Sequence, residues 1–220
     1  KGLGFRVHDL TTQLCREVVA RGDLDTLSRE RVFKELEKAL SAPHPSEFFA
    51  VLASVNALAQ MFQGVELAET KNLDGPATDT SPPSRFSQLV LENPDLDLQG
   101  LNKQLAIPKH WLELASMTRT WAAAFCQVTT LSADAILAVL ERGDARRKPE
   151  RFAQSVHISC QSLIIDSAEQ TQILGLWQRL AQETAKVSLP ETASGLSGQD
   201  IKAMIRAEQL RRIEATCDRN

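Results

Sequence analysis

The stretch SRERVFKELEKAL, residues 28–40, is the clearest indication of the fold. From Phe33 to Leu40 its apolar residues recur at three- and four-residue spacing, which places them on one face of an α-helix. Ser28 is a residue type that caps helix N-termini, and Pro43 follows the last apolar position. The pattern predicts an amphipathic helix that starts after Ser28 and ends before Pro43.

The same spacing recurs along the rest of the chain. Gly143 is placed to end a helix, and Ser197 and Asp200 have the spacing of a capping box. No stretch alternates with the period of two that half-buried strands show. We therefore predict an all-α fold. Further helices are expected over residues 46–61, 86–91, 108–125, 132–142, 149–163, 167–185 and 197–214.

One segment has a different composition. Between residues 66 and 97 there are seven acidic residues against two basic ones, together with Gly75 and four prolines. Such a stretch is typical of a loop. We expect two helical clusters joined by this Pro-rich acidic loop: neck and body helices over 1–66, the linker over 67–97, and body and tail helices over 98–220.

The overall composition is that of a soluble globular protein. The chain has 220 residues, of which 43% are hydrophobic and 24% charged, and its net charge is −3. Its longest mostly apolar stretch, residues 48–62, is too short to cross a membrane. The chain begins with Lys1 rather than Met, so we expect it to be a piece of a longer protein. No signal peptide follows Lys1, and we expect that protein to be cytoplasmic. The four cysteines form no CxxC pair and are expected to be reduced thiols.

No catalytic motif is visible in the sequence. The Gly-rich phosphate loops, the zinc-protease HExxH and the GxSxG of serine hydrolases are absent. The dipeptide His8-Asp9 lacks the further histidines and carboxylate that a metal phosphohydrolase needs, and Asp95 and Asp97 are better explained as solvated charges. On these patterns we expect no catalytic residue and no metal site in this chain.

Two basic clusters are the strongest functional signal. Each has a net charge of +3, and the second has cations at four-residue spacing along a helix. Guanidinium groups arranged in this way can bind phosphate oxygens without reading bases. The alternative is a solubilising surface with internal salt bridges. The candidate residues are Arg146, Arg147, Lys148 and Arg151 in the first cluster, which also contains Arg142, and Lys202, Arg206, Arg211 and Arg212 in the second.

Several stretches, in this order and spacing, resemble a known family. They are LGFR at 3–6, LSRERVFKE at 27–35, FFAVL at 48–52, DARRKPERF at 144–152 and GLSGQDI at 195–201. Together they resemble the neck, body and tail of bacterial class II tRNA nucleotidyltransferases, the CCA-adding enzymes, and of the related bacterial poly(A) polymerases. Each stretch alone is unspecific, and the order and spacing carry the resemblance.

The resemblance implies an enzyme that adds CCA to tRNA 3′ ends from CTP and ATP without a nucleic-acid template. It implies that a catalytic head precedes Lys1 and holds Mg²⁺ through two carboxylates, so that this chain alone neither binds Mg²⁺ productively nor transfers a nucleotide. Polyadenylation by the same family is the first alternative. A non-catalytic helical protein-interaction module is the alternative from another class.

The resemblance also implies roles for particular residues. Glu30, Arg31 and Glu35 would brace the neck helices that frame the nucleotide pocket, with Glu30 beside Lys34 and Arg31 beside Glu35. The eight candidate cations would hold the acceptor stem and T-arm of tRNA through A-form backbone shape. We expect no DNA and no membrane partner, and the oligomeric state stays open. Residues 85–90 lack the His-Asp pair of a fused phosphohydrolase, so no phosphatase activity is expected.

Overall fold

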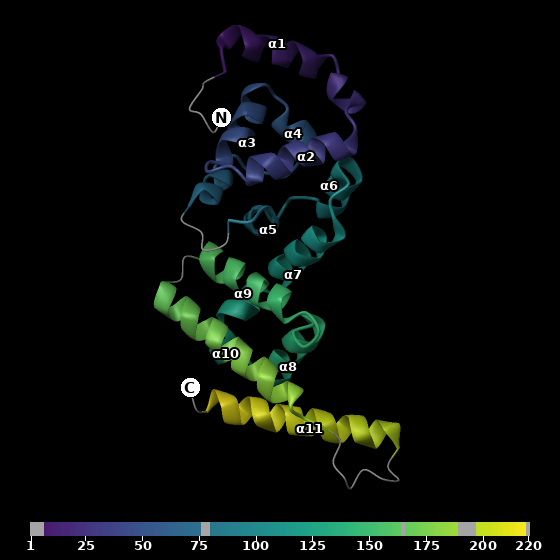
Figure 1. The fold of residues 1–220 in the computed structure, drawn as a ribbon, viewed down its shortest axis with the longest axis vertical. Coiled ribbons are helices and arrows are strands. Elements are labelled where there is room, and N and C mark those ends of the chain that lie inside the picture. The colour runs from purple at the N-terminus through teal and green to yellow at the C-terminus, as the bar shows by residue number, and fades with distance from the viewer. Residues whose placement is uncertain (1–6, 76–79, 164–165, 189–196, 219–220) are drawn as a thin grey trace. The chain divides into compact units, whose positions relative to one another are not determined.

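The computed structural model describes residues 7–75, 80–163, 166–188 and 197–218, and every regular element within them is a helix (Figure 1). The prediction of an all-α fold is confirmed. Residues 3–6 and 195–196, which belong to the stretches that carry the family resemblance, lie outside the described residues. Within the described ranges, no helix combines the length and the apolar character needed to span a bilayer.

The chain divides into two compact units, residues 1–119 and 120–220, and α7 (Lys109–Cys126) crosses the boundary. The first unit contains α1 (Asp9–Ala20), η1 (Asp23–Thr26), α2 (Arg29–Leu40), α3 (Ser46–Ser54), α4 (Leu58–Met61), η2 (Glu69–Asp74), α5 (Pro82–Glu92) and α6 (Leu98–Leu105), where η marks a 3-10 helix. The second contains η3 (Val128–Thr130), α8 (Ala133–Arg142), α9 (Pro149–Ser162), α10 (Ser167–Ala185) and α11 (Gly198–Cys217).

The division differs from the expected one, because η2 and α5, which lie within the acidic Pro-rich segment, pack inside the first unit. The helix η2 contacts α3 and α5, and α5 in turn packs on α2. The prolines at the start of α5 occupy the first helical positions, where a missing N–H costs nothing. Behind them Phe86, Leu89 and Val90 are at most 1% exposed. Apolar burial therefore outweighs the loop-like composition of the segment.

Aromatic side chains connect the helices of the first core. The ring of Trp111 lies with its centroid 5.0 Å from that of Phe33 and 5.6 Å from that of Phe86. These three residues come from α7, α2 and α5, and all are buried. Phe49 of α3 and Phe62 belong to the same core, with centroids 5.6 Å apart. The helix predicted from residue 28 onwards therefore buries the predicted apolar face.

The single helix predicted over residues 46–61 is wrong, because the structure breaks it into α3 and α4. Asn56 lies between them in the left-handed region, with φ 63°. Asn is one of the few residue types that adopt this conformation readily, and it commonly ends helices. The next backbone N–H, of Ala57, donates to the carbonyl of Leu52 over 2.8 Å. The apolar pattern continues through the break, which is why periodicity alone did not reveal it.

Arg85 of α5 is a buried cation that caps the end of α2. Its Nη1 donates to the carbonyls of Leu40 and Ala42, at 2.6 and 2.7 Å. Carbonyls at a helix C-terminus lack intrahelical partners and carry partial negative charge. Burial lowers the pKa of Arg85, whereas the carboxylate of Asp74 opposes that shift. The Arg85 side chain therefore joins α5 to the end of α2 within the core.

The second unit is built around α10, which packs against α9 on one side, while α11 packs against both α10 and α8 (Figure 1). Its core contains the rings of Phe125, Phe152 and Trp177, whose centroids lie 5.3 to 5.8 Å apart in edge-to-face contacts. The indole Nε1–H of Trp177 donates to the carbonyl of Phe125 over 2.9 Å. The three rings come from α7, α9 and α10, and these three helices therefore pack together at this cluster.

We expect Gly64→Ala to destabilise the first unit. Gly64 has φ 86°, and a Cβ there would lie 2.5 Å from the backbone oxygen of Asp95. The left-handed backbone and the contact together should lower the free energy of unfolding by about 2–4 kcal/mol. Urea denaturation followed by circular dichroism measures it. Gly198→Ala is the matched control, since its Cβ would meet nothing within 4 Å. Equal stability of the two variants would contradict this packing.

Candidate nucleic-acid interface

The first basic cluster is centred on the segment 143–148, which joins α8 to α9 in the second unit, with Arg142 at the end of α8 and Arg151 in the first turn of α9. Gly143 ends α8, as predicted. A Cβ at Gly143 would lie 2.8 Å from the ring of Phe152 and 2.7 Å from the carbonyl oxygen of Val139. The absence of a side chain therefore allows the segment to turn closely over α9. Asp144, the next residue, has φ 58° and completes the turn.

Asp144 organises the cations of this segment. Its Oδ1 accepts a hydrogen bond from Arg147 Nε at 2.7 Å, and its Oδ2 lies 4.0 Å from Arg151 Nη2. The hydrogen bond from Arg147 lowers the pKa of Asp144, and the same bond raises the pKa of Arg147. Arg147 remains 82% exposed although one edge of its guanidinium is engaged. The other guanidinium N–H groups of Arg147 are thus oriented by the turn and accessible from solvent.

The remaining cations of the segment differ in accessibility. Arg146 and Lys148 are exposed, whereas Arg151 is 20% exposed and belongs largely to the body of the unit. Among the described residues Arg146 makes no ion pair and no hydrogen bond through its side chain. Three of the four predicted cations of this cluster, Arg146, Arg147 and Lys148, are therefore brought together on an accessible turn.

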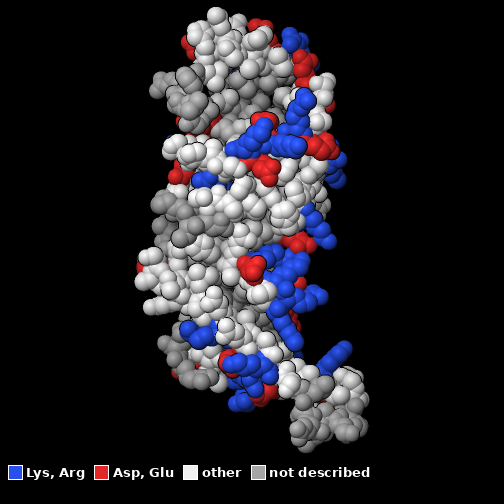
Figure 2. Space-filling model, viewed as in Figure 1, with Lys and Arg blue, Asp and Glu red and all other residues white. Residues whose placement is uncertain are grey.

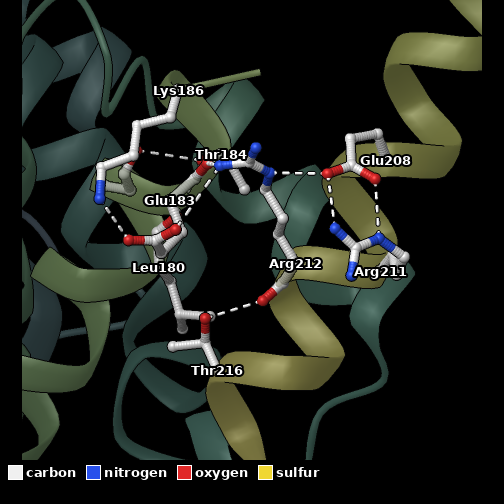
Figure 3. Close-up of polar contacts among 9 residues, drawn as sticks. Leu180, Glu183, Thr184, Lys186, Glu208, Arg211, Arg212 and Thr216 are labelled. Carbon is white, nitrogen blue, oxygen red and sulfur yellow. Dashed lines mark hydrogen bonds and ion pairs between the residues drawn. The ribbon is translucent and has the colours of Figure 1, made fainter.

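The second basic cluster, on α11, is largely neutralised by acidic side chains (Figure 3). Arg211 forms two hydrogen bonds to Glu208, at 2.7 and 2.8 Å, and Arg212 Nε donates to the same carboxylate at 2.8 Å. Arg212 also approaches Glu183 of α10, with 3.6 Å between Nη1 and Oε2. These two arginines lower the pKa of Glu208 to about 2. Ion pairs within the protein, the alternative considered from the sequence, account for these two cations.

Arg206 and Lys202 complete the α11 cluster. Arg206 Nη2 lies 2.7 Å from Asp134 Oδ1 in the first turn of α8, so this pair joins two helices. Lys202 is exposed and has no side-chain partner among the described residues. Ile213 and Thr216 are the buried residues of α11, and the pair Arg206–Asp134 adds an exposed polar contact between α11 and α8.

Both clusters are visible on one face of the second unit. Figure 2 shows Lys and Arg side chains over the segment between α8 and α9 and again over α11, with Asp and Glu atoms among those of α11. The face therefore combines an accessible cationic turn with a helix whose cations already have carboxylate partners.

The neck motif lies on the exposed face of α2. The expected pairing of Glu30 with Lys34 and of Arg31 with Glu35 is wrong: in the described residues neither pair forms. Glu35 instead contacts Lys38, with 2.7 Å between Oε1 and Nζ. Exposed i,i+3 and i,i+4 partners are close to equivalent in free energy, so the spacing alone did not determine which would form.

The acidic partners are the site residues that the sequence analysis missed. Glu208 could have been found, because it stands three and four residues before Arg211 and Arg212. Asp134 and Glu183 gave no such signal, since they are brought to α11 by packing. In the described part of the chain, no group of three or more His, Cys, Asp or Glu side chains could hold a metal ion.

Comparisons with known proteins identify relatives of the chain. A family model described as "Probable RNA and SrmB- binding site of polymerase A" matches residues 4–68. A multifunctional CCA protein of Pseudomonas putida strain KT2440 is 31% identical over 97% of this chain. A CCA-adding enzyme of strain F1 of that species is 31% identical over the same share, and one of Coxiella burnetii is 30% identical over 69% of the chain. No solved structure matches the chain.

By these matches the chain is similar to proteins that carry CCA names, and part of it to a probable RNA-binding site of polymerase A. More particularly, the chain belongs to the family of CCA-adding enzymes and poly(A) polymerases, and the resemblance drawn from the sequence is confirmed. The chain spans 59% of the length of each of the two Pseudomonas putida relatives.

We expect the stability of the second unit to depend on pH through Glu208. Its pKa is about 2 in the folded protein and near 4.5 in the unfolded chain. The stabilisation is therefore complete above about pH 4.5 and is lost as the pH falls towards 2. Urea midpoints measured between pH 5.5 and 2.5 should fall more steeply for the native protein than for Glu208→Gln.

The matched control for this pH series is Glu150→Gln, which removes an exposed carboxylate from the first turn of α9. Its pH profile should parallel that of the native protein. Identical profiles for Glu208→Gln and the native protein would show that the two arginines do not hold Glu208 in solution.

Proposed function

We propose that this chain is the RNA-holding part of a tRNA nucleotidyltransferase that adds CCA to tRNA 3′ ends from CTP and ATP. The observation that carries the proposal is the similarity of almost the whole chain to CCA-adding proteins. The match of residues 4–68 to a probable RNA-binding site adds independent support. The chain would act in the cytoplasm, where tRNA is processed.

The accessible cationic turn is the proposed centre of RNA contact. Arg146, Arg147 and Lys148 would bind phosphate oxygens, and Arg147 would do so with its orientation already set by Asp144. A protein reads double-stranded RNA mainly through its backbone and shape. The acceptor stem and T-arm of tRNA present such a backbone, so a set of positioned cations is suited to hold them while the 3′ end reacts elsewhere.

The cations of α11 would contribute less to RNA binding than those of the turn, and not all to the same extent. Lys202 is available to a phosphate without rearrangement, whereas Arg206, Arg211 and Arg212 would share or exchange their carboxylate partners. Exchange of one ion pair for another yields less net free energy than engagement of a free cation. We therefore rank Lys202 above the three arginines as an RNA contact, and we place Arg151 last because it is largely buried.

Chemistry would take place in the part of the relatives that this chain does not span. Mg²⁺, ATP and CTP belong to that part in our proposal, as the similarity to CCA-adding enzymes implies. When bound there, Mg²⁺ would polarise the α-phosphate and activate the attacking 3′-hydroxyl. For this chain we propose a positioning role, with Glu30, Arg31 and Glu35 supporting the neck helix α2 against the nucleotide pocket.

Polyadenylation is the alternative activity within the family. The family model takes its description from polymerase A. The relatives compared above carry CCA names, and for that reason CCA addition is the favoured function.

We expect the protein to bind tRNA with a steep dependence on salt. Arg146→Gln combined with Lys202→Gln should weaken tRNA binding several-fold at low salt. It should also reduce the slope of log K against log[salt] by about 1–2, because binding releases fewer counterions when fewer phosphates are contacted. Fluorescence anisotropy with labelled tRNA at 50–200 mM KCl measures both effects. Lys71→Gln is the matched control, since it removes an exposed cation of the first unit.

The same titration distinguishes the competing classes of function. Indifference to tRNA at low salt would favour a helical protein-interaction module. An effect of Lys71→Gln half that of the double variant would mean that every removed charge counts equally, and it would contradict the proposed surface.

The full-length protein should extend a tRNA that lacks its terminal CCA. Incorporation of labelled CTP and ATP should stop after three nucleotides, whereas a poly(A) polymerase would add a long tail from ATP alone. Gel separation of the products at single-nucleotide resolution reads the outcome. A tRNA that already ends in CCA is the control and should not be extended. A ladder of adenylates on either substrate would overturn the assignment to CCA addition.

A further inference from the structure

Two cysteines of the second unit lie in direct contact. Cys126, at the end of α7, and Cys160, in the last turns of α9, have their sulfur atoms 3.5 Å apart. Cys160 is fully buried and Cys126 is partly exposed. They stand 34 positions apart in the sequence, so no spacing motif announces them. The fold alone makes them neighbours.

We propose that Cys126 and Cys160 form a modification site at which a hydroperoxide oxidant produces an intramolecular disulfide. A disulfide has a sulfur–sulfur distance of about 2.05 Å, so the two atoms have about 1.5 Å to close. Rotation of the two side chains can supply a movement of this size. Cys126 is the partly exposed member of the pair and Cys160 the buried one, so an oxidant from solvent would reach Cys126 first.

The hydrogen bond between the two sulfurs polarises the pair. It lowers the pKa of Cys126 and raises that of Cys160. The carboxylate of Glu169, in the first turn of α10, opposes ionisation of both thiols. Since a thiolate is the nucleophile in thiol oxidation, Cys126 is the residue that attacks first.

The chemistry balances with one equivalent of hydrogen peroxide. The Cys126 thiolate attacks a peroxide oxygen, the O–O bond breaks, and a sulfenic acid forms with loss of hydroxide. The Cys160 sulfur then attacks the sulfenic sulfur, the S–O bond breaks, and the departing oxygen leaves as water with the proton of Cys160. Two thiols are oxidised to one disulfide while one peroxide is reduced to two waters.

The disulfide would close a covalent loop around the candidate interface. The loop contains α8, the cationic segment 143–148 and most of α9. Linking its ends restricts the unfolded chain more than the folded one. Oxidation should therefore raise the melting temperature of the second unit, by about 5 °C or more for a loop of this length in a unit of about 100 residues.

Peptide mass spectrometry of the peroxide-treated full-length protein tests the proposal. Cleavage by trypsin after Arg119, Arg142, Arg151 and Arg179 places the two cysteines in different peptides. We expect these peptides to be joined after treatment with hydrogen peroxide and to separate after reduction. Cys15, which is exposed, and Cys217 serve as internal references, and they should be recovered outside any link to this pair.

Two variants test the roles of Cys160 and Glu169 in the reaction. Cys160→Ala should leave a sulfenic acid on Cys126 that dimedone captures, whereas the native protein should give little adduct. Glu169→Gln should speed formation of the disulfide several-fold without changing its partners. The proposal is overturned if Cys126 of the native protein accumulates the dimedone adduct, or if both thiols remain reduced when Cys15 is fully oxidised. Unfolding of Cys160→Ala would leave the peptide analysis of the native protein as the deciding measurement.

Discussion

The second unit depends on the meeting of three rings, Phe125, Phe152 and Trp177, one from each of three helices. Edge-to-face packing of aromatic rings fixes both distance and orientation, and the indole hydrogen bond to Phe125 prevents Trp177 from sliding along α7. Phe152 stands in the first turn of α9. The cluster therefore determines where α9 begins, and with it the position of the cationic segment 143–148.

Electrostatics divides the basic residues of this unit into two kinds. On the turn, Asp144 orients Arg147 and leaves it exposed to solvent. On α11, Arg211 pairs with Glu208 of the same helix, whereas Arg206 and Arg212 also reach carboxylates of α8 and α10 and so join helices. A count of cations along the sequence treats these two kinds as equal. The geometry makes them unequal, since a cation that holds two helices together is not free to bind a phosphate without loosening them.

Predictions from the sequence held for features that depend on neighbouring residues and failed for contacts between residues far apart in the sequence. Local signals marked the helix ends: Ser197 caps α11 and Gly143 ends α8 as predicted, while Ser28 stands at the N-cap of α2 without a side-chain cap hydrogen bond. The sequence did not predict contacts whose two partners are far apart along the chain. Arg85 finds carbonyls more than forty positions away, and Arg206 finds Asp134 across 72 positions. Neither contact has a period or a motif in the sequence.

The break at Asn56 shows a different limit. A left-handed residue can stand within a continuous apolar pattern, because the pattern records which side chains are buried and not how the backbone reaches the core. Composition misleads in the same way at α5. This helix belongs to a segment rich in prolines and acidic residues, and it is nevertheless buried in the first unit.

The distribution of aromatic residues gives the two units separate optical signatures. The chain has no tyrosine, so its intrinsic fluorescence originates in three tryptophans. Trp111 is enclosed by the rings of the first core, and Trp177 is enclosed by those of the second with its N–H engaged. The third, Trp121, is half-buried and belongs to the second unit. Each unit thus contains a buried tryptophan, and changes in the wavelength and intensity of the emitted light report the unfolding of both units.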